Sequence, residues 1–233
     1  MKTIGLIGGM SWESTVTYYQ CINEGVKAAL GGLHSAKILL SSVDFYEIEK
    51  CQAAGDWEQS AGILTRAAQS LEQGGADFIL ICTNTMHKVA PQIAQGVHIP
   101  VVHIAEATAT ALKARGIRRA ALLGTKYTMT QDFYRGKLEE AGLEVLIPDP
   151  EDVERVNDVI FNELCLGIIS EASKADYLRI IDALARRGAQ GVILGCTEIG
   201  LLIDQRDTQL PVFDTTRIHS QRAVELALEG EGR

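Results

Sequence analysis

Short aliphatic and β-branched runs alternate with longer amphipathic stretches along the chain. The runs predict strands, because such residues bounded by turn residues are typical of buried strands. The predicted strands are residues 3–7, 36–41, 78–82, 101–104, 120–123, 145–147, 192–194 and 212–213. Apolar residues at helical spacing predict helices at residues 11–30, 57–73, 105–114, 130–140, 151–166, 170–187 and 215–229. Strands that alternate with helices of this length indicate an α/β fold with mainly parallel sheets.

The order of these elements contains an internal repeat. Its clearest part pairs residues 75–85 with residues 188–198 without a gap, as GADFILICTNT and GAQGVILGCTE. Two further pairs keep the same order at similar spacing: residues 6–9 with 122–125, and residues 99–103 with 210–214. Three matches in one order favour a duplicated half-domain over chance. The sequence therefore predicts two similar Rossmann-like lobes, related by a pseudo-twofold duplication, that face each other with the active site between them.

The repeat also predicts where the lobes divide. We expect the first lobe to hold residues 1–103 together with 212–233, and the second lobe to hold residues 104–211. The last predicted helix, at 215–229, lies beyond the second repeat. The C-terminal segment is therefore expected to return to the first lobe.

Small polar residues follow two predicted strands in each lobe. The first lobe has Gly8-Gly9-Met10-Ser11 and Cys82-Thr83-Asn84-Thr85, and the second has Gly124-Thr125 and Gly195-Cys196-Thr197-Glu198. Ligands bind at the carboxyl ends of parallel strands, and amides and hydroxyls at such turns suit a carboxylate or a phosphate. The first motif lacks the third glycine of the dinucleotide fingerprint, and there is no GxxxxGK[ST] sequence. We therefore expect no nucleotide cofactor.

Composition and charge narrow the range of partners. The chain has 233 residues, with 22 Lys and Arg against 30 Asp and Glu, which gives a net charge of −8. A nucleic-acid partner is not expected, because a phosphate backbone requires a basic face. No membrane association is expected, because no run reaches the ~18 apolar residues of a span and the start does not resemble a signal peptide. The five cysteines form no metal-ligand pattern, which predicts no metal and free thiols in a reducing cytoplasm.

The strand-end motifs resemble those of the aspartate/glutamate racemase superfamily over nearly the whole chain. The residues that carry the resemblance are 8–11, Asn84-Thr85-Met86-His87, Gly124-Thr125 and 195–198. Glu198 favours the aspartate-racemase branch, because glutamate racemases usually have His after the Cys-Thr pair. The resemblance implies a cofactor-independent (PLP-independent) isomerase that interconverts L- and D-amino acids, with aspartate/glutamate or broader specificity. It also implies one acid/base residue in each lobe, a small amino-acid substrate and a homodimer.

One position departs from the pattern of most of this family. A cysteine usually precedes the Asn-Thr pair, whereas Thr83 precedes Asn84 here and Cys82 lies one residue earlier. The internal repeat independently aligns Thr83 with Cys196. Neighbouring side chains on a strand point to opposite sides, so we expect Thr83 at the site and Cys82 as a buried, inert residue. A subgroup of these racemases is similar in having Thr at this position.

Racemisation needs one group that takes the α-proton and another that returns a proton on the opposite face. A thiol has a reference pKa of about 8.5, and we expect the amides of a helix after Cys196 to lower that pKa. A threonine hydroxyl is a far weaker acid, so Thr83 is expected to donate or relay a proton. The site is therefore predicted to be asymmetric. The resemblance implies which residue acts on which enantiomer: Cys196 takes the α-proton of the L-enantiomer.

The remaining predicted site residues bind the substrate. The resemblance implies the following set: Asn84, Thr85, Thr125 and Thr197 for the carboxylate, Gln52 for the side chain, and Met10 in the first motif. Glu198 orients the substrate ammonium, holds Cys196, or merely caps its helix. Gln52 is equally compatible with a position in an exposed loop. Without the resemblance, Cys196 is equally compatible with a position in the core.

The histidines are assigned supporting or surface roles. His87, at a predicted helix start, caps that helix or supports the site, and His103, at a strand end, is expected to support it. The remaining three, His34, His98 and His219, are predicted to lie on the surface or in loops.

Two other functions stay open. A decarboxylase or cis–trans isomerase of the same superfamily can work with one thiol, and only one cysteine is expected at this site. A non-catalytic binding protein for an amino acid or carboxylate is compatible with the loss of the first cysteine.

Overall fold

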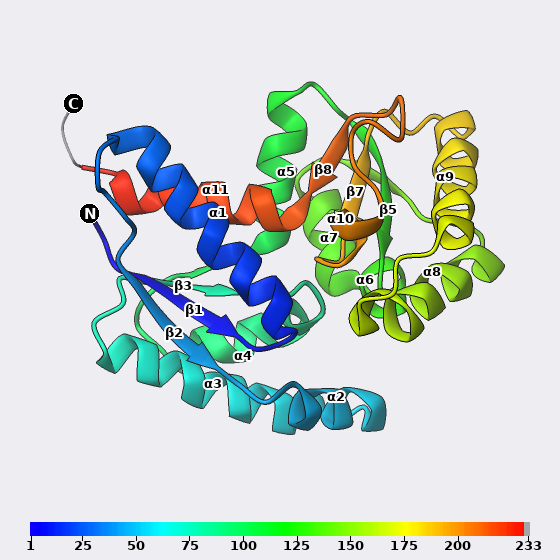
Figure 1. Ribbon diagram of the computed structural model, residues 1–233. Coiled ribbons are helices and arrows are strands. Elements are labelled where there is room, and N and C mark those ends of the chain that lie inside the picture. The colour runs from blue at the N-terminus through cyan, green and yellow to red at the C-terminus, as the bar shows by residue number, and fades with distance from the viewer. Residues whose placement is uncertain (231–233) are drawn as a thin grey trace. The chain divides into compact units, whose positions relative to one another are not determined.

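The computed structural model describes residues 1–230 as two α/β units (Figure 1). The first unit comprises Met1–Ile104 and the chain from Thr216 onward, and the second comprises Ala105–Thr215. Each unit is built on one four-stranded parallel sheet. The predicted α/β class with parallel sheets is therefore confirmed.

The first sheet has the strand order β2-β1-β3-β4. Its strands are β1 (Ile4–Gly8), β2 (Ile38–Ser42), β3 (Phe78–Ile81) and β4 (Val101–Val102). Helices α1 (Trp12–Leu30) and α11 (Thr215–Leu228) cover one face, and α3 (Trp57–Gln73) covers the other (Figure 1). Strand alternation explains this arrangement, because Leu6 packs with the α1 and α11 side while Ile7 packs with the α3 side.

The second sheet repeats this topology with the order β6-β5-β7-β8. Its strands are β5 (Arg119–Gly124), β6 (Glu144–Leu146), β7 (Val192–Gly195) and β8 (Val212–Asp214). The position of each strand in the first sheet has its counterpart here, which confirms the internal repeat read from the sequence. All eight predicted strands are present, and no strand end shifts by more than two residues.

The other helical segments connect these strands. They are α2 (Phe45–Ala54), η1 (Thr85–Val89), α4 (Ala90–Gln95), α5 (Ile104–Ala114), α6 (Lys126–Thr130), α7 (Asp132–Glu140), α8 (Pro150–Asn162), η2 (Leu164–Leu166), α9 (Glu171–Arg186) and α10 (Ile199–Leu202). The Ser11 hydroxyl caps α1 by accepting a hydrogen bond from the Ser14 amide at 3.3 Å, as predicted from the sequence. Helix α2 was not predicted, although Asp44 caps its start and Gly55 ends it in the left-handed conformation.

The expected boundary between the lobes is wrong by four residues at its C-terminal side. Strand β8 pairs with β7, so residues 212–215 belong to the second unit rather than the first. The return to the first unit occurs within the first turn of α11, at Thr216. The physical reason is that Val212 and Phe213 complete the second sheet before the chain turns into the helix. Residues 231–233 of the expected first lobe lie outside the described residues.

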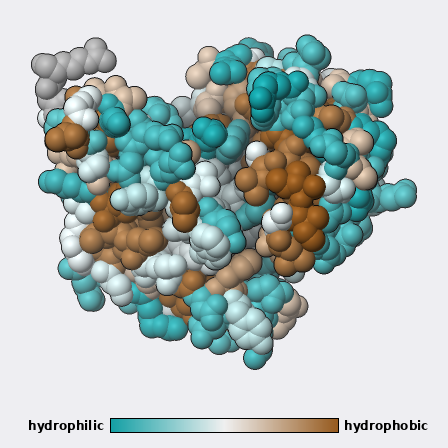
Figure 2. All heavy atoms as spheres, in the orientation of Figure 1, coloured by the Kyte–Doolittle hydropathy of each residue, from teal (hydrophilic) through white to brown (hydrophobic). Residues whose placement is uncertain are grey.

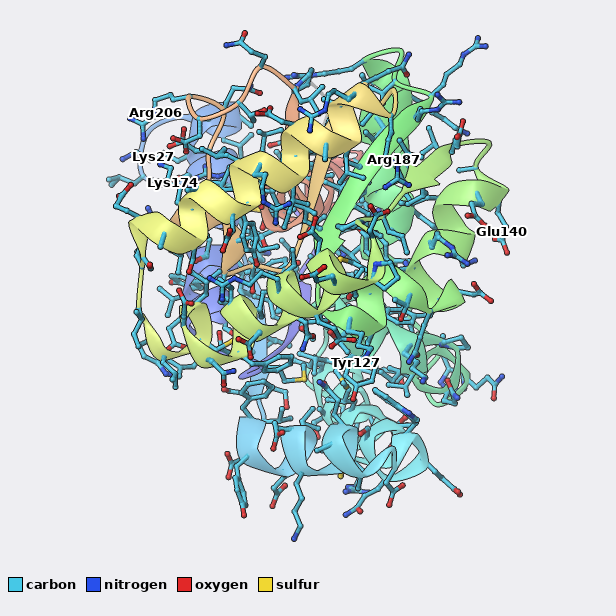
Figure 3. The ribbon with its side chains drawn as sticks, turned by 90° about the vertical axis from the view of Figure 1, so that its right-hand side faces the viewer. Lys27, Tyr127, Glu140, Lys174, Arg187 and Arg206 are labelled. Atoms are coloured by element: carbon cyan, nitrogen blue, oxygen red, sulfur yellow. The ribbon has the colours of Figure 1, made fainter. Side chains whose placement is uncertain are left out.

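Charged side chains of the second unit are largely engaged in surface ion pairs. Lys174 lies 2.6 Å from Asp207, and Arg187 lies 3.4 Å from Asp149. Figure 3 shows Lys174 and Arg187 at opposite ends of α9. Such exposed pairs contribute little to stability.

An apolar surface patch lies on η2, the following loop and α10 of the second unit. Its members are more than half exposed: Leu166, Ile168, Ile169 and Leu201. Figure 2 shows this area as a brown patch on the second unit. Within residues 1–230, no helix has both the length and the apolar character that crossing a bilayer requires.

Candidate functional site

The predicted site residues of the first unit gather where β1 and β3 end. Ile7 of β1 pairs with Ile81 of β3, so the chains after these strands begin side by side. Gly9 has a φ of +92°, and a Cβ there would lie 2.1 Å from the Val43 carbonyl oxygen. Only glycine fits this turn, and its amide donates to the Thr15 hydroxyl at 2.8 Å.

The side chains of Cys82 and Thr83 differ in the way strand alternation predicts. Cys82 is fully buried among Leu6, Tyr18 and Leu80, and burial raises the pKa of its thiol far above the ordinary value. Thr83, one residue later, is partly exposed. A buried thiol with a raised pKa is a poor acid/base group at neutral pH, so the expectation that Cys82 is inert agrees with its surroundings.

The second unit repeats this arrangement at the ends of β5 and β7. Gly124 and Gly195 are direct partners in the ladder, and a Cβ on Gly124 would lie 2.9 Å from the Gly195 carbonyl oxygen. This close approach requires glycine at both positions and brings the next residues, Thr125 and Cys196, to neighbouring strand ends. Thr125 caps α6, since its hydroxyl accepts from the Thr128 amide at 3.3 Å.

A single carboxylate oxygen organises the turn after β7. The Cys196 thiol donates to Glu198 Oε2 at 3.0 Å, and the Thr197 hydroxyl donates to the same oxygen at 2.6 Å. Glu198 is buried, whereas Cys196 and Thr197 are partly exposed. In this arrangement the Cys196 thiol and the Thr197 hydroxyl are the donors, and Glu198 Oε2 accepts both bonds.

The expected direction of the Cys196 pKa is wrong. The removal of the thiol from water raises its pKa well above the ordinary value, and the charge of Glu198 raises it further. The predicted helix effect is weak because α10 has only four residues and starts three residues after Cys196. Burial and the charge of Glu198 both favour the protonated thiol over the thiolate in the free protein.

The other predicted binding residues divide between the two units. Asn84 and Thr85 are buried at the start of η1 in the first unit. Met10 is buried in the same apolar cluster as Ile48 of α2. Gln52 is buried one turn beyond Ile48 on α2, so the alternative of an exposed loop residue is wrong. Asp44 before and Gly55 after residues 45–54 are the cap signals that could have revealed this helix.

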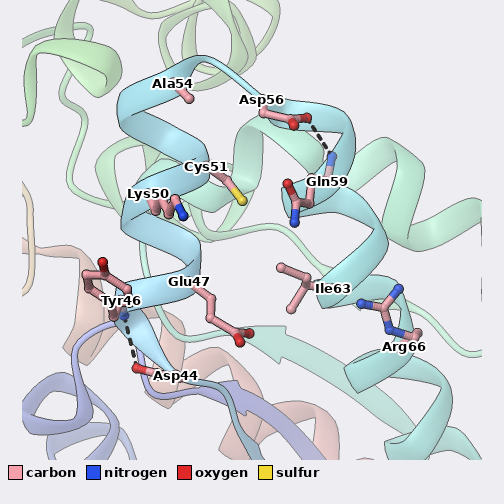
Figure 4. Close-up of a pocket in the computed structure, with 10 residues that line it drawn as sticks. All are labelled: Asp44, Tyr46, Glu47, Lys50, Cys51, Ala54, Asp56, Gln59, Ile63 and Arg66. Carbon is pink, nitrogen blue, oxygen red and sulfur yellow. Dashed lines mark hydrogen bonds between the residues drawn. The ribbon is translucent and has the colours of Figure 1, made fainter.

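A polar cavity of about 560 Å³ lies elsewhere in the first unit, between α2 and α3. Its lining residues are Asp44, Tyr46, Glu47, Lys50, Cys51, Ala54, Asp56, Gln59, Ile63 and Arg66. Figure 4 shows Cys51 and Gln59 pointing into the space between the two helices. The carboxylates of Asp44 and Asp56 accept from the Tyr46 and Gln59 amides at 3.1 and 3.0 Å. None of the predicted site residues lines this cavity, so it is separate from the candidate site.

His219 is a structural residue that no pattern in the sequence indicates. It is fully buried on α11, where its Nδ1 lies 2.9 Å from the Tyr18 hydroxyl, so the predicted surface position is wrong. His87 is also buried and contacts the backbone of Thr83 through Nδ1 at 2.8 Å, as expected for a residue that supports the site. Within residues 1–230, no three His, Cys, Asp or Glu side chains are grouped so as to hold a metal ion.

Comparison with known proteins identifies relatives that match nearly the whole chain. The model of the Asp/Glu/hydantoin racemase family matches residues 7–223. A solved candidate Asp/Glu racemase from Yersinia pestis is 57% identical, with a TM-score of 0.93, and the match covers 98% of this chain and 100% of that one. An aspartate racemase homologue from Pyrococcus horikoshii is 40% identical, with a TM-score of 0.86 and coverage of 98% and 100%.

A curated relative is more distant in sequence. The broad-specificity amino-acid racemase RacX of Bacillus subtilis is 24% identical over 226 residues, which cover 95% of this chain and 96% of that protein. The family match covers far more than half of the chain and agrees with the duplicated α/β topology. The chain therefore belongs to the Asp/Glu/hydantoin racemase family.

Proposed function

We propose that the protein is a cofactor-independent racemase of α-amino acids, with aspartate, glutamate or a broader set of amino acids as substrates. The observation that carries this proposal is the equivalent position of Thr83 and Cys196, each at the end of the third strand of its half. Residues at matching places in a duplicated fold are suited to act on opposite faces of one carbon. The similarity to known and candidate racemases supports this reaction class.

The proposed reaction moves two protons. The Cys196 thiolate takes the α-proton of the L-enantiomer, and the electron pair of that C–H bond stays on the substrate as a carbanion. Thr83 delivers its hydroxyl proton to the opposite face, which completes the D-enantiomer. The Cys196 thiol then gives its proton to solvent water, and the Thr83 alkoxide takes a proton from solvent water. The hydronium and hydroxide ions so formed neutralise each other, which restores the thiolate and the hydroxyl.

Glu198 links substrate binding to activation of the thiol in this proposal. Its carboxylate raises the pKa of Cys196 in the free protein. A substrate ammonium that pairs with Glu198 offsets this charge and lowers the cost of forming the thiolate. The protein thus keeps its thiol protonated until an amino acid binds.

Glu198→Gln is expected to change thiol reactivity and turnover in opposite directions. Without the carboxylate, the pKa of Cys196 falls. At a pH below that pKa, a fall of one pH unit in the pKa gives about tenfold more thiolate. Iodoacetamide is therefore expected to alkylate Cys196 faster at pH 7 to 9. Peptide mass spectrometry measures the rate. Racemase kcat/KM is expected to fall, because the ammonium loses its partner. A variant in which both alkylation and turnover slow down would contradict this role.

Asn84→Ala and Thr85→Ala test the carboxylate pocket. Each is expected to reduce kcat/KM by the order of 10-fold or more, as for a lost hydrogen bond to a charged group. Steady-state kinetics with both enantiomers measure this effect, and circular dichroism checks that the variants fold. Unchanged kinetics in both variants would place the carboxylate elsewhere.

The function itself is tested by incubating the wild-type protein with aspartate, glutamate and several neutral amino acids. Chiral chromatography detects the opposite enantiomer, and trapped CO₂ detects decarboxylation. The proposal predicts the opposite enantiomer without CO₂. Release of CO₂ would favour a decarboxylase, and ligand binding without turnover would favour a binding protein. Light scattering in the same buffer tests the homodimer that the family resemblance implies.

A further inference from the structure

A buried imidazole joins the ends of β3 and β4 in the first unit. His87 is 1% exposed, and its Nδ1 lies 2.8 Å from the Thr83 carbonyl oxygen. Its Nε2 lies 3.2 Å from the Ile104 amide nitrogen. Thr83 follows β3 and Ile104 follows β4, so one ring bridges two neighbouring strand ends.

The two partners determine which ring nitrogen carries the proton. The Ile104 amide can only donate, so Nε2 accepts and is unprotonated. Nδ1 therefore carries the hydrogen and donates it to the Thr83 carbonyl oxygen. Burial, followed by the neighbouring His103, lowers the pKa of His87 well below its ordinary value. The ring is thus neutral at neutral pH, and both hydrogen bonds persist.

Two more histidines pack around this ring. The ring centres of His103 and His219 lie 4.6 and 5.7 Å from that of His87. His219 donates from Nε2 to the Val102 carbonyl oxygen at 2.9 Å and accepts from the Tyr18 hydroxyl at Nδ1. These contacts hold the end of β4 and restrict the orientation of His87.

The second unit has glycine where the first has His87. The repeat pairs residues 75–85 with 188–198, and the same register continued by two residues places His87 opposite Gly200. A Cβ on Gly200 would lie 3.3 Å from Asp214 Oδ2, which is a tight contact. The strand ends are joined there by the Thr215 hydroxyl, which donates to the Leu194 carbonyl oxygen at 2.8 Å. The imidazole bridge thus belongs to the half that carries a hydroxyl instead of a thiol.

We propose that His87 is the positioning residue of the Thr83 half of the site. Its Nδ1–H holds the Thr83 carbonyl oxygen and so fixes the turn that presents the Thr83 hydroxyl to the α-carbon. This inference rests on the proposed racemase function. A hydroxyl is a weaker proton donor than a thiol and depends more on its placement, and a displacement of about 1 Å can cost about 10²-fold in rate. No proton passes through His87.

Three variants separate the two hydrogen bonds of the imidazole. His87→Asn keeps a donor near the position of Nδ1, whereas His87→Gln keeps an acceptor near the position of Nε2. His87→Leu removes both. Tyr18→Phe is the matched control, because it removes one hydrogen bond from the same histidine cluster without touching His87 or Thr83.

The readout is α-deuterium exchange in D₂O, measured separately from each enantiomer. His87→Gln and His87→Leu are expected to slow exchange from the enantiomer that faces Thr83 by 10-fold or more. Exchange from the enantiomer that faces Cys196 is expected to stay within about twofold, with little change in KM. His87→Asn is expected to recover most of the loss, and Tyr18→Phe to behave as wild type. A purely structural role would instead lower both exchange rates together, and that result would overturn the proposal.

A second measurement tests the hydrogen-bonded bridge of His87 between Thr83 and Ile104 and does not depend on turnover. Amide hydrogen exchange followed by mass spectrometry is expected to show weaker protection of residues 82–88 in His87→Gln than in His87→Asn. Equal protection in the two variants would show that the Nδ1 hydrogen bond of His87 does not hold the Thr83 turn, which would overturn the proposal. If the wild-type protein exchanges no α-proton from any amino acid, the proposed function fails while this comparison still decides whether His87 holds the Thr83 turn.

Discussion

Cys196→Ser is expected to abolish racemisation in both directions, with a loss of at least ~10³-fold in kcat/KM. General acid–base groups typically contribute 10²–10⁴-fold, and a serine hydroxyl is too weak an acid to replace the thiol. The proposed reaction has no second base on that face of the α-carbon. Steady-state turnover from each enantiomer, measured by chiral chromatography, gives the size of the loss.

Cys21→Ser is the matched control for this substitution. Cys21 is a partly buried cysteine on α1 of the first unit and is not one of the predicted site residues. It is expected to retain turnover within a few-fold. Binding of aspartate to Cys196→Ser, measured by calorimetry, separates lost chemistry from lost binding. Near-normal turnover of Cys196→Ser would remove this residue from the mechanism.

Thr83→Ala and Cys82→Ala are expected to have opposite outcomes although the residues are neighbours. Thr83→Ala removes the proposed proton donor, so racemisation is expected to fall by ~10²-fold or more. Exchange of the α-proton on the enantiomer that faces Cys196 is expected to survive, because that step needs only one base. Cys82→Ala is expected to leave catalysis largely intact and to cost some stability, because Cys82 is fully buried in the core.

The comparison of these two variants also tests the alignment of the two halves. Thermal unfolding of Cys82→Ala shows whether any loss of activity comes from a loss of folded protein. A folded Cys82→Ala protein without activity, together with a nearly normal Thr83→Ala protein, would shift the catalytic position by one residue. Thr83→Cys is expected to speed turnover of the D-enantiomer if the pocket accepts the larger sulfur atom.

The sequence predicted the fold well because the fold depends on hydrophobic periodicity. The aliphatic runs identified every strand, and the repeat predicted the common strand order of the two sheets. Helix α2 was missed because only three of its ten residues are buried, which leaves a weak apolar pattern. The lobe boundary near residue 212 was misplaced because β8 and α11 are adjacent in the chain, and only strand pairing shows that β8 belongs to the second sheet.

The residues of the candidate site were easier to predict than their electrostatics. Residue types and spacing drew attention to Cys196 and Glu198. The direction of the thiol pKa depended first on the burial of the sulfur and then on the rotamer that points Glu198 Oε2 at it. Neither property is visible in the local sequence. His219 was misjudged for a similar reason, because its partners, Tyr18 and Val102, lie more than 100 residues away.

The central claim is that two groups act on opposite faces of the α-carbon. The most direct test follows the wild-type protein in D₂O with a single enantiomer of the substrate, and mass spectrometry measures the α-deuterium content of the first product formed. A two-group mechanism predicts a product enantiomer that carries solvent deuterium in nearly every molecule, because the group that returns the proton is not the one that took it. A product that retains the original α-hydrogen in a large fraction of molecules would contradict the account, and so would the absence of any deuterated product.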